Sequence, residues 1–130
     1  MNTNIVRYQF EQGIPGFEHV KQFVFEEMGD ELPMKLMKAE DDSEVSLLVA
    51  SPFMFYPEYE WKLPDSVKEE LEIESEADVE VWSVMTIPLD LVGATVNLLA
   101  PIILNTRTGK GKQLILHEHT YSSRAPIHRT

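Results

Sequence analysis

The sequence has 130 residues, the usual size of one domain, and its 43% hydrophobic and 25% charged residues are close to the average for folded, water-soluble proteins. It contains no cysteine, which excludes disulfides, thiolate metal sites and cysteine catalysis. The net charge of −11 is concentrated in residues 26–80, where eighteen acidic residues stand against four basic ones, so direct nucleic-acid binding through phosphate neutralisation is not expected.

Most of the chain is predicted to form short strands. In residues 5–10 the apolar side chains of Val6, Tyr8 and Phe10 alternate with polar ones, which is the period of a half-buried strand. Segment 13–17, with two glycines and a proline, ends this strand in a turn. Further strands are expected over residues 22–26, 34–39, 45–50, 79–87, 95–99, 102–104 and 112–118, with hairpins around the acidic loop 40–44 and the turn 108–111.

One short α-helix is expected near residues 65–72. Ser66 and Glu69 have the spacing of a capping box, which marks the start of a helix. Val67 and Leu71, four residues apart, give the helix one narrow apolar stripe.

These elements predict a mainly β protein, a small antiparallel β-barrel-like domain with this one helix, and a β-sandwich is the alternative that short strands leave open. No interdomain linker interrupts residues 1–130, so we expect a single domain, with a frayed tail after about residue 122. No apolar run approaches the roughly 20 residues of a membrane span, and the N-terminal residues lack the apolar core of a signal peptide. We therefore expect a cytoplasmic protein that does not enter membranes.

The most apolar run of the chain is TVNLLAPIILN, residues 95–105. Its pattern predicts a buried strand that is broken at Pro101, because proline cannot donate to a sheet ladder. We expect Asn97 and Asn105 to hydrogen-bond with backbone groups, the first at the break and the second at the turn that follows.

No set of residues in the sequence carries a catalytic mechanism, and neither a cofactor nor a bound metal is expected. His117 and His119, two apart on a predicted strand, would point to the same face, a spacing that can support zinc. No third ligand is evident beside them. The alternative that these histidines leave open is a small β-barrel metal-dependent enzyme.

Residues 51–61, SPFMFYPEYEW, combine aromatic side chains with two prolines. The prolines prevent a central strand over the whole segment, so part of its apolar surface must leave the sheet. Tyr, Trp, Phe and Met are the residue types enriched at the centres of protein interfaces. This aromatic segment is therefore either a plug at one end of the barrel or a surface for a partner.

Three stretches of the chain match motifs of a known protein family, and they occur in the same order along the sequence. They are Ile14-Pro15-Gly16-Phe17-Glu18, the segment from Pro52 to Glu60, and TVNLLAPIILN followed by Gly111-Lys112-Gln113-Leu114-Ile115-Leu116. Together they resemble the FliW family of bacterial flagellar assembly factors, over residues 5–125. The resemblance implies a β-barrel-like protein without enzymatic activity, which we expect to be monomeric when free.

The resemblance also implies that the protein acts by exchanging partners. Members of the FliW family bind cytoplasmic flagellin. When free of flagellin they bind CsrA, a small basic RNA-binding dimer that represses translation of flagellin mRNA. Flagellin synthesis is thereby matched to flagellin export.

For flagellin we expect a helix docked in a groove, because flagellin termini that are kept from polymerising expose amphipathic helical surface. The aromatic segment offers the apolar cover that such a helix needs. Its expected contact residues are Phe53, Phe55, Tyr56 and Tyr59.

For CsrA we expect an acidic surface, since complementary charge speeds association with a basic partner and makes the affinity fall with salt. The acidic residues on and after the predicted helix would supply it, and their negative field would oppose RNA phosphates without occupying the RNA site. The expected residues are Glu69, Glu70, Glu72, Glu74 and Glu76.

Overall fold

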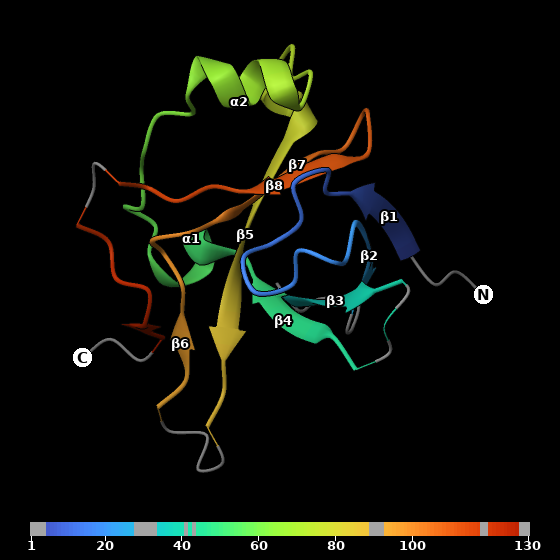
Figure 1. Ribbon diagram of the computed structural model, residues 1–130. Coiled ribbons are helices and arrows are strands. Elements are labelled where there is room, and N and C mark those ends of the chain that lie inside the picture. Colours follow the sequence, from blue (N-terminus) through green and yellow to red (C-terminus); the bar gives the residue numbers. More distant parts are fainter. Residues whose placement is uncertain are drawn as a thin grey trace.

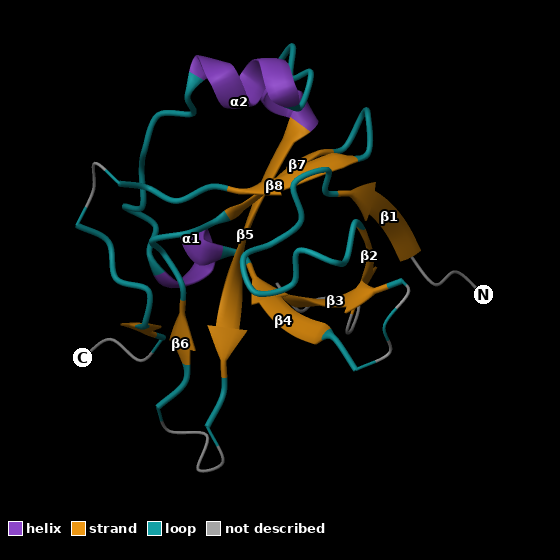
Figure 2. Ribbon diagram, in the orientation of Figure 1, coloured by secondary structure: helices purple, strands orange, loops and turns teal. Residues whose placement is uncertain are grey.

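The computed structural model describes residues 5–27, 34–40, 42, 44–88, 93–117 and 120–127. Figure 1 and Figure 2 show a strongly curved sheet with short helices outside it. The strands are β1 (Ile5–Gln9), β2 (Gln22–Glu27), β3 (Met34–Ala39), β4 (Ser46–Ala50), β5 (Val79–Thr86), β6 (Thr95–Val96), β7 (Ile102–Asn105), β8 (Lys110–Gln113) and β9 (Ala125–Pro126). The helices are α1 (Pro52–Phe55), α2 (Asp65–Glu70) and the 3-10 helix η1 (Glu76–Asp78).

Seven of the described strands close into a barrel. Their order is β4-β3-β2-β1-β8-β7-β5, and a pairing of β5 with β4 joins the two ends. Within the described residues every pairing is antiparallel except that of β1 with β8, which meet at Gln9 and Lys110. β6 pairs with β5, and β9 pairs with β6, so these two short strands extend the sheet outside the ring. The predicted β-barrel-like fold is confirmed.

Aromatic side chains fill the inside of the barrel. Phe10 and Phe23 are fully buried, and their rings meet edge to face with centroids 5.3 Å apart. Tyr8 and Phe25 form a second edge-to-face pair, also at 5.3 Å, and burial raises the pKa of Tyr8 to about 12. The face predicted for β1 is therefore inside at Tyr8 and Phe10, whereas Val6 remains 43% exposed.

A second apolar layer lies outside the barrel, over β5 and β7. Ile102 and Leu104 belong to the interior cluster, whereas Ile103 packs outward against Val67 of α2 and Leu71, the residue directly after it. All four residues of β7 are buried. The run IILN therefore lacks polar alternation because the strand is covered on both faces.

The two asparagines of TVNLLAPIILN bond with the backbone, as predicted. Oδ1 of Asn97 accepts from two backbone N–H groups just before the proline, each at 3.0 Å. Oδ1 of Asn105 accepts from the N–H groups of Arg107 and Thr108 in the following turn, at 2.9 and 3.2 Å. Each side chain thereby satisfies backbone donors where the ladder is interrupted.

Most of the predicted strands and hairpins are present with small shifts, and the helix expected near residues 65–72 is α2. The predicted capping box is not formed, since the N-cap of α2 is Pro64 and no side chain caps it. The strand expected over residues 95–99 is limited to Thr95–Val96, because Asn97 turns its side chain to the N–H groups of Leu99 and Ala100. A further helix, α1, was not predicted. Pro52 ends the ladder of β4 because it has no N–H, and its fixed φ suits the first turn of a helix. β8 ends at Gln113 instead of continuing to residue 118, although the N–H of Leu116 still donates to Leu99 at 2.8 Å.

The expected frayed tail is not what the structure shows for the described residues after 122. Ala125 is only 4% exposed and pairs with Val96 in the ladder between β9 and β6. This short strand was missed because two residues carry no periodicity that a sequence pattern can reveal.

Candidate functional site

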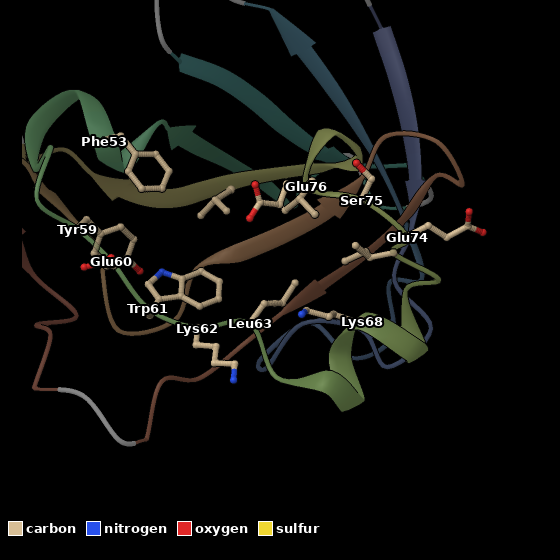
Figure 3. Close-up of a pocket in the computed structure, with 13 residues that line it drawn as sticks. Phe53, Tyr59, Glu60, Trp61, Lys62, Leu63, Lys68, Glu74, Ser75 and Glu76 are labelled. Atoms are coloured by element: carbon tan, nitrogen blue, oxygen red, sulfur yellow. The ribbon is translucent and has the colours of Figure 1, made fainter.

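A groove of about 760 Å³ lies beside β5, between the aromatic segment and the region of α2 and η1. In Figure 3, Phe53, Tyr59 and Trp61 lie at one side of the groove and Glu74 and Glu76 at the other. The apolar lining is Phe53, Tyr59, Trp61, Leu63, Ile73, Val79 and Val81, and the charged lining is Glu60, Lys62, Lys68, Glu74 and Glu76.

The aromatic wall of the groove comes from α1 and the residues that follow it. Phe53 and Met54, on the single turn of α1, are 44% and 60% exposed. Tyr59 is buried, its hydroxyl donates to the carbonyl of Leu98 at 2.7 Å, and burial raises its pKa. The ring of Phe53 lies 5.7 Å from that of Tyr59. The wall thus has a fixed, buried base and an exposed apolar tip.

Residues 120–127 contact the same wall. The hydroxyl of Tyr121 accepts from the N–H of Glu60 at 3.1 Å and donates to the carbonyl of Glu60 at 2.7 Å. The hydroxyl of Tyr56 donates to the carbonyl of Pro126 at 2.5 Å. Pro126, one of the residues that were expected to fray, therefore contacts the segment directly after α1.

The acidic wall follows the C-terminus of α2, which ends in a Schellman motif. The N–H of Ile73 donates to the carbonyl of Lys68 at 2.8 Å, and that of Glu72 to Glu69 at 3.2 Å. Glu72 holds the left-handed position, with φ of 58°, where glycine is usual. Nδ2 of the buried Asn105 donates to two carbonyls of this turn, at 2.7 and 3.1 Å. The turn is therefore fixed to the end of β7.

Cations of the hairpin between β7 and β8 pair with three of the five glutamates predicted for CsrA. Glu69 and Glu76 form no ion pair within the described part of the chain. The hydrogen bond and charge of Lys110 lower the pKa of Glu72, and the same contact raises the pKa of Lys110. The pairs are Lys112 with Glu70 at 3.3 Å, Arg107 with Glu74 at 3.5 Å, and Lys110 with Glu72.

The groove brings together part of each predicted partner site. Phe53 and Tyr59 of the flagellin set line it, and so do Glu74 and Glu76 of the CsrA set. Residues that were predicted to serve different partners therefore share one surface.

The remaining predicted residues do not line the groove. Phe55 and Tyr56 are half-buried and pack against a further cluster of buried residues, which includes Met85, Val96 and Leu98. Glu69, Glu70 and Glu72 lie on α2 and its C-terminal turn, beside the acidic wall.

Sequence reasoning missed most of the groove floor, which is formed by Trp61, Leu63, Ile73, Val79 and Val81. These side chains come from separate segments that only the fold brings together. One signal was available, because the segment that forms β5 carries apolar residues on both faces, which indicates cover on its outer side.

The predicted alternative, a metal site at His117 and His119, cannot be placed. His117 is exposed, and His119 lies outside the described residues. In the described ranges no three His, Cys, Asp or Glu side chains come together in a group that could hold a metal ion. No helix in those ranges is both long and apolar enough to cross a bilayer.

Known proteins resemble this chain over nearly its whole length. The family model "FliW protein" matches residues 2–127. A "Flagellar assembly factor FliW" from Bacillus licheniformis is 39% identical over 118 residues, and one from Bacillus subtilis 38% over 118 residues; each alignment covers 91% of this chain and 82% of the relative. A solved structure, "Crystal structure of the flagellar assembly factor FliW", superposes with a TM-score of 0.88 at 33% identity, over 95% of this chain and 86% of that one. The chain therefore belongs to the FliW family of flagellar assembly factors.

Proposed function

We propose that this protein is a non-enzymatic, cytoplasmic flagellar assembly factor that exchanges partners. It binds flagellin, and when free of flagellin it binds CsrA and relieves the repression of flagellin mRNA translation. Membership of the FliW family supports the flagellar role. The observation that carries the exchange is that residues expected for each partner line the same groove. Two partners that need one groove exclude each other.

The flagellin side of the groove is the exposed tip of the aromatic wall. Phe53 and Met54 together present the most exposed apolar surface near the groove. Covering a large apolar side chain contributes about 1.5–3 kcal/mol. Because Tyr59 is already buried and bonded to Leu98, it supports this surface and offers little area to a partner.

The CsrA side is the acidic wall and the adjoining α2. Glu69 and Glu76 have no ion pair among the described residues, so their charge is available to a basic partner. Glu70, Glu72 and Glu74 already have cations beside them and would gain less from a second one. The two unpaired glutamates are therefore the sharper probes of CsrA binding.

Two variants separate the partner sites. Reversing charge at Glu69 and Glu76, both to Lys, should weaken CsrA binding about tenfold or more at low salt and flagellin binding little. Phe53→Ala should do the opposite. A matched control with the same charge change, Glu11→Lys with Glu44→Lys, lies outside the groove lining and should leave both affinities near those of the unaltered protein. Equal loss of both partners in the first variant would contradict the assignment.

A further inference from the structure

The C-terminal segment 120–127 is fixed to the sheet at both ends. The N–H of Leu98 donates to the carbonyl of Ser122 at 3.0 Å, and the N–H of Ile127 donates to the carbonyl of Ala94 at 3.1 Å. Between these bonds β9 pairs with β6. The segment therefore has its own anchorage, independent of the groove.

From this anchorage the segment reaches the aromatic wall through two tyrosine hydroxyls. Tyr121 binds both backbone groups of Glu60, at 3.1 and 2.7 Å, and Glu60 lines the groove. Tyr56, just after α1, bonds to the carbonyl of Pro126 at 2.5 Å. The wall is thus tied to the C-terminal segment on both sides of Pro57.

Ring contacts connect Tyr121 with the side chains that face the groove. Its ring lies 4.8 Å from that of Tyr59, at an interplanar angle of 69°. Tyr59 in turn lies 6.4 Å from Trp61 and 5.7 Å from Phe53. A shift of Tyr121 would therefore be transmitted through these ring contacts to Tyr59, Trp61 and Phe53 of the apolar lining.

We propose that residues 120–127 form a clamp that sets the position of the aromatic wall for flagellin, with Tyr121 as its positioning residue. This rests on the proposed function, in which the aromatic wall contacts flagellin. Tyr121 holds the backbone of Glu60, and the neighbouring side chains of Tyr59 and Trp61 line the groove. The acidic wall is held separately, by Asn105 and the hairpin cations, so the clamp acts on one partner site only.

The test is Tyr121→Phe, which keeps the ring and removes both hydrogen bonds to Glu60. Titration with purified flagellin monomer should show an affinity lowered about tenfold, whereas titration with purified CsrA should change by less than about twofold. The matched control is Tyr8→Phe, the same chemical change inside the barrel, and it should leave both affinities within about twofold. A general loss of structure would lower both affinities together.

A second measurement uses the unaltered protein and does not depend on how the variant folds. Saturating flagellin should slow amide hydrogen exchange at Glu60, whose N–H bonds to Tyr121 of the clamp, and at Ile127, whose N–H anchors the clamp to Ala94. The reason is that binding to a positioned wall stabilises the clamp. Amides of β2, on the far side of the barrel ring from β5, should not change.

The results of these experiments distinguish an error in the clamp proposal from an error in the proposed function. The clamp is wrong, and the flagellin site stands, if Tyr121→Phe binds flagellin like the unaltered protein, loses both partners equally, or if flagellin leaves exchange at Glu60 unchanged. If the unaltered protein does not bind flagellin at all, the proposed function and the clamp are both wrong.

Discussion

Asn105, the last residue of β7, is fully buried and binds two other parts of the molecule. Its Nδ2 donates to the carbonyls of Leu71 and Glu72, at the end of α2. Its Oδ1 accepts from Arg107 and Thr108, in the turn between β7 and β8. One side chain thereby satisfies backbone groups of a helix end and of a turn, and its bond to the carbonyl of Leu71 is buried.

Replacing Asn105 by Ala should lower the free energy of unfolding by about 2–4 kcal/mol, because four backbone groups lose a hydrogen bond and one of them, the carbonyl of Leu71, is buried. The matched control is Asn97→Ala, in the same apolar run, which removes only contacts to two N–H groups of a half-buried loop and should cost about 1 kcal/mol. Urea denaturation measures both. Equal costs at the two positions would show that Asn105 has no special structural role.

Ser83 is also a buried polar residue, but it differs from Asn105 in its hydrogen bonding. Its side chain is fully buried on the outer face of β5, and its hydroxyl has no hydrogen-bond partner among the described residues. Ser83→Ala should therefore leave the free energy of unfolding unchanged or raise it by up to about 1 kcal/mol. A loss of about 1 kcal/mol or more on urea denaturation would mean that the hydroxyl has a partner.

At the scale of elements, β8 packs against the residue that follows β1, Phe10, through a glycine, Gly111. A Cβ added at Gly111 would lie 2.6 Å from the ring of the fully buried Phe10 and 2.9 Å from the side chain of Leu104. No flexible chain end can move aside there, so Gly111→Ala should cost about 1–3 kcal/mol.

The matched control for Gly111 is Gly93→Ala, where the nearest atom to an added Cβ is Pro88 Cγ at 3.5 Å, an ordinary contact. It should change the free energy of unfolding little. Thermal unfolding of the two variants side by side makes the comparison, and similar melting temperatures would contradict close packing between β8 and Phe10.

The ion pair of Glu72, in the turn after α2, with Lys110 of β8 makes the junction of these elements sensitive to pH. Because Lys110 lowers the pKa of Glu72 below its ordinary value of 4.5, the pair stabilises the fold above pH 4.5 and is lost as pH falls through the lowered pKa. At the alkaline end the same contribution is lost as pH rises through the raised pKa of Lys110, above 10.5.

The predicted loss of stability at acidic pH is tested by measuring the free energy of unfolding of Glu72→Gln from pH 6 to pH 3. Its stability should fall less over that range than that of the unaltered protein, because the variant has no carboxylate to protonate at the junction. High salt should narrow the difference, since Glu72 is 56% exposed. Identical pH profiles would show that the pair contributes nothing to stability.

At the scale of the whole molecule, local patterns predicted the elements better than the site. The alternation of apolar and polar residues was sufficient to predict β1, because a strand with one polar face has a period of two residues. The turn residues before β8 were sufficient to predict its hairpin. α1 and β9 were missed because a helix of one turn and a strand of two residues depend on tertiary contacts. The groove could not be predicted, since Trp61, Ile73 and Val81 meet only when the barrel closes.

The predicted partner residues differ in exposure and in ion pairing, because both properties depend on the fold and not on the residue type. Phe53 and Tyr59 have the same aromatic character in the sequence, yet one is 44% exposed and the other 4%. Likewise Glu72 and Glu76 are equal as charges, but only Glu72 has a lysine beside it. Which cation a glutamate meets depends on the β7–β8 hairpin, more than thirty residues away along the chain.

In the function proposed here, flagellin and CsrA exclude each other at one groove. Titrating CsrA into the protein at increasing fixed concentrations of purified flagellin tests this exclusion. We expect the apparent dissociation constant for CsrA to rise in proportion to flagellin concentration, with no complex containing all three proteins. A CsrA affinity that is unchanged on flagellin-saturated protein, with a stable complex of all three, would contradict it.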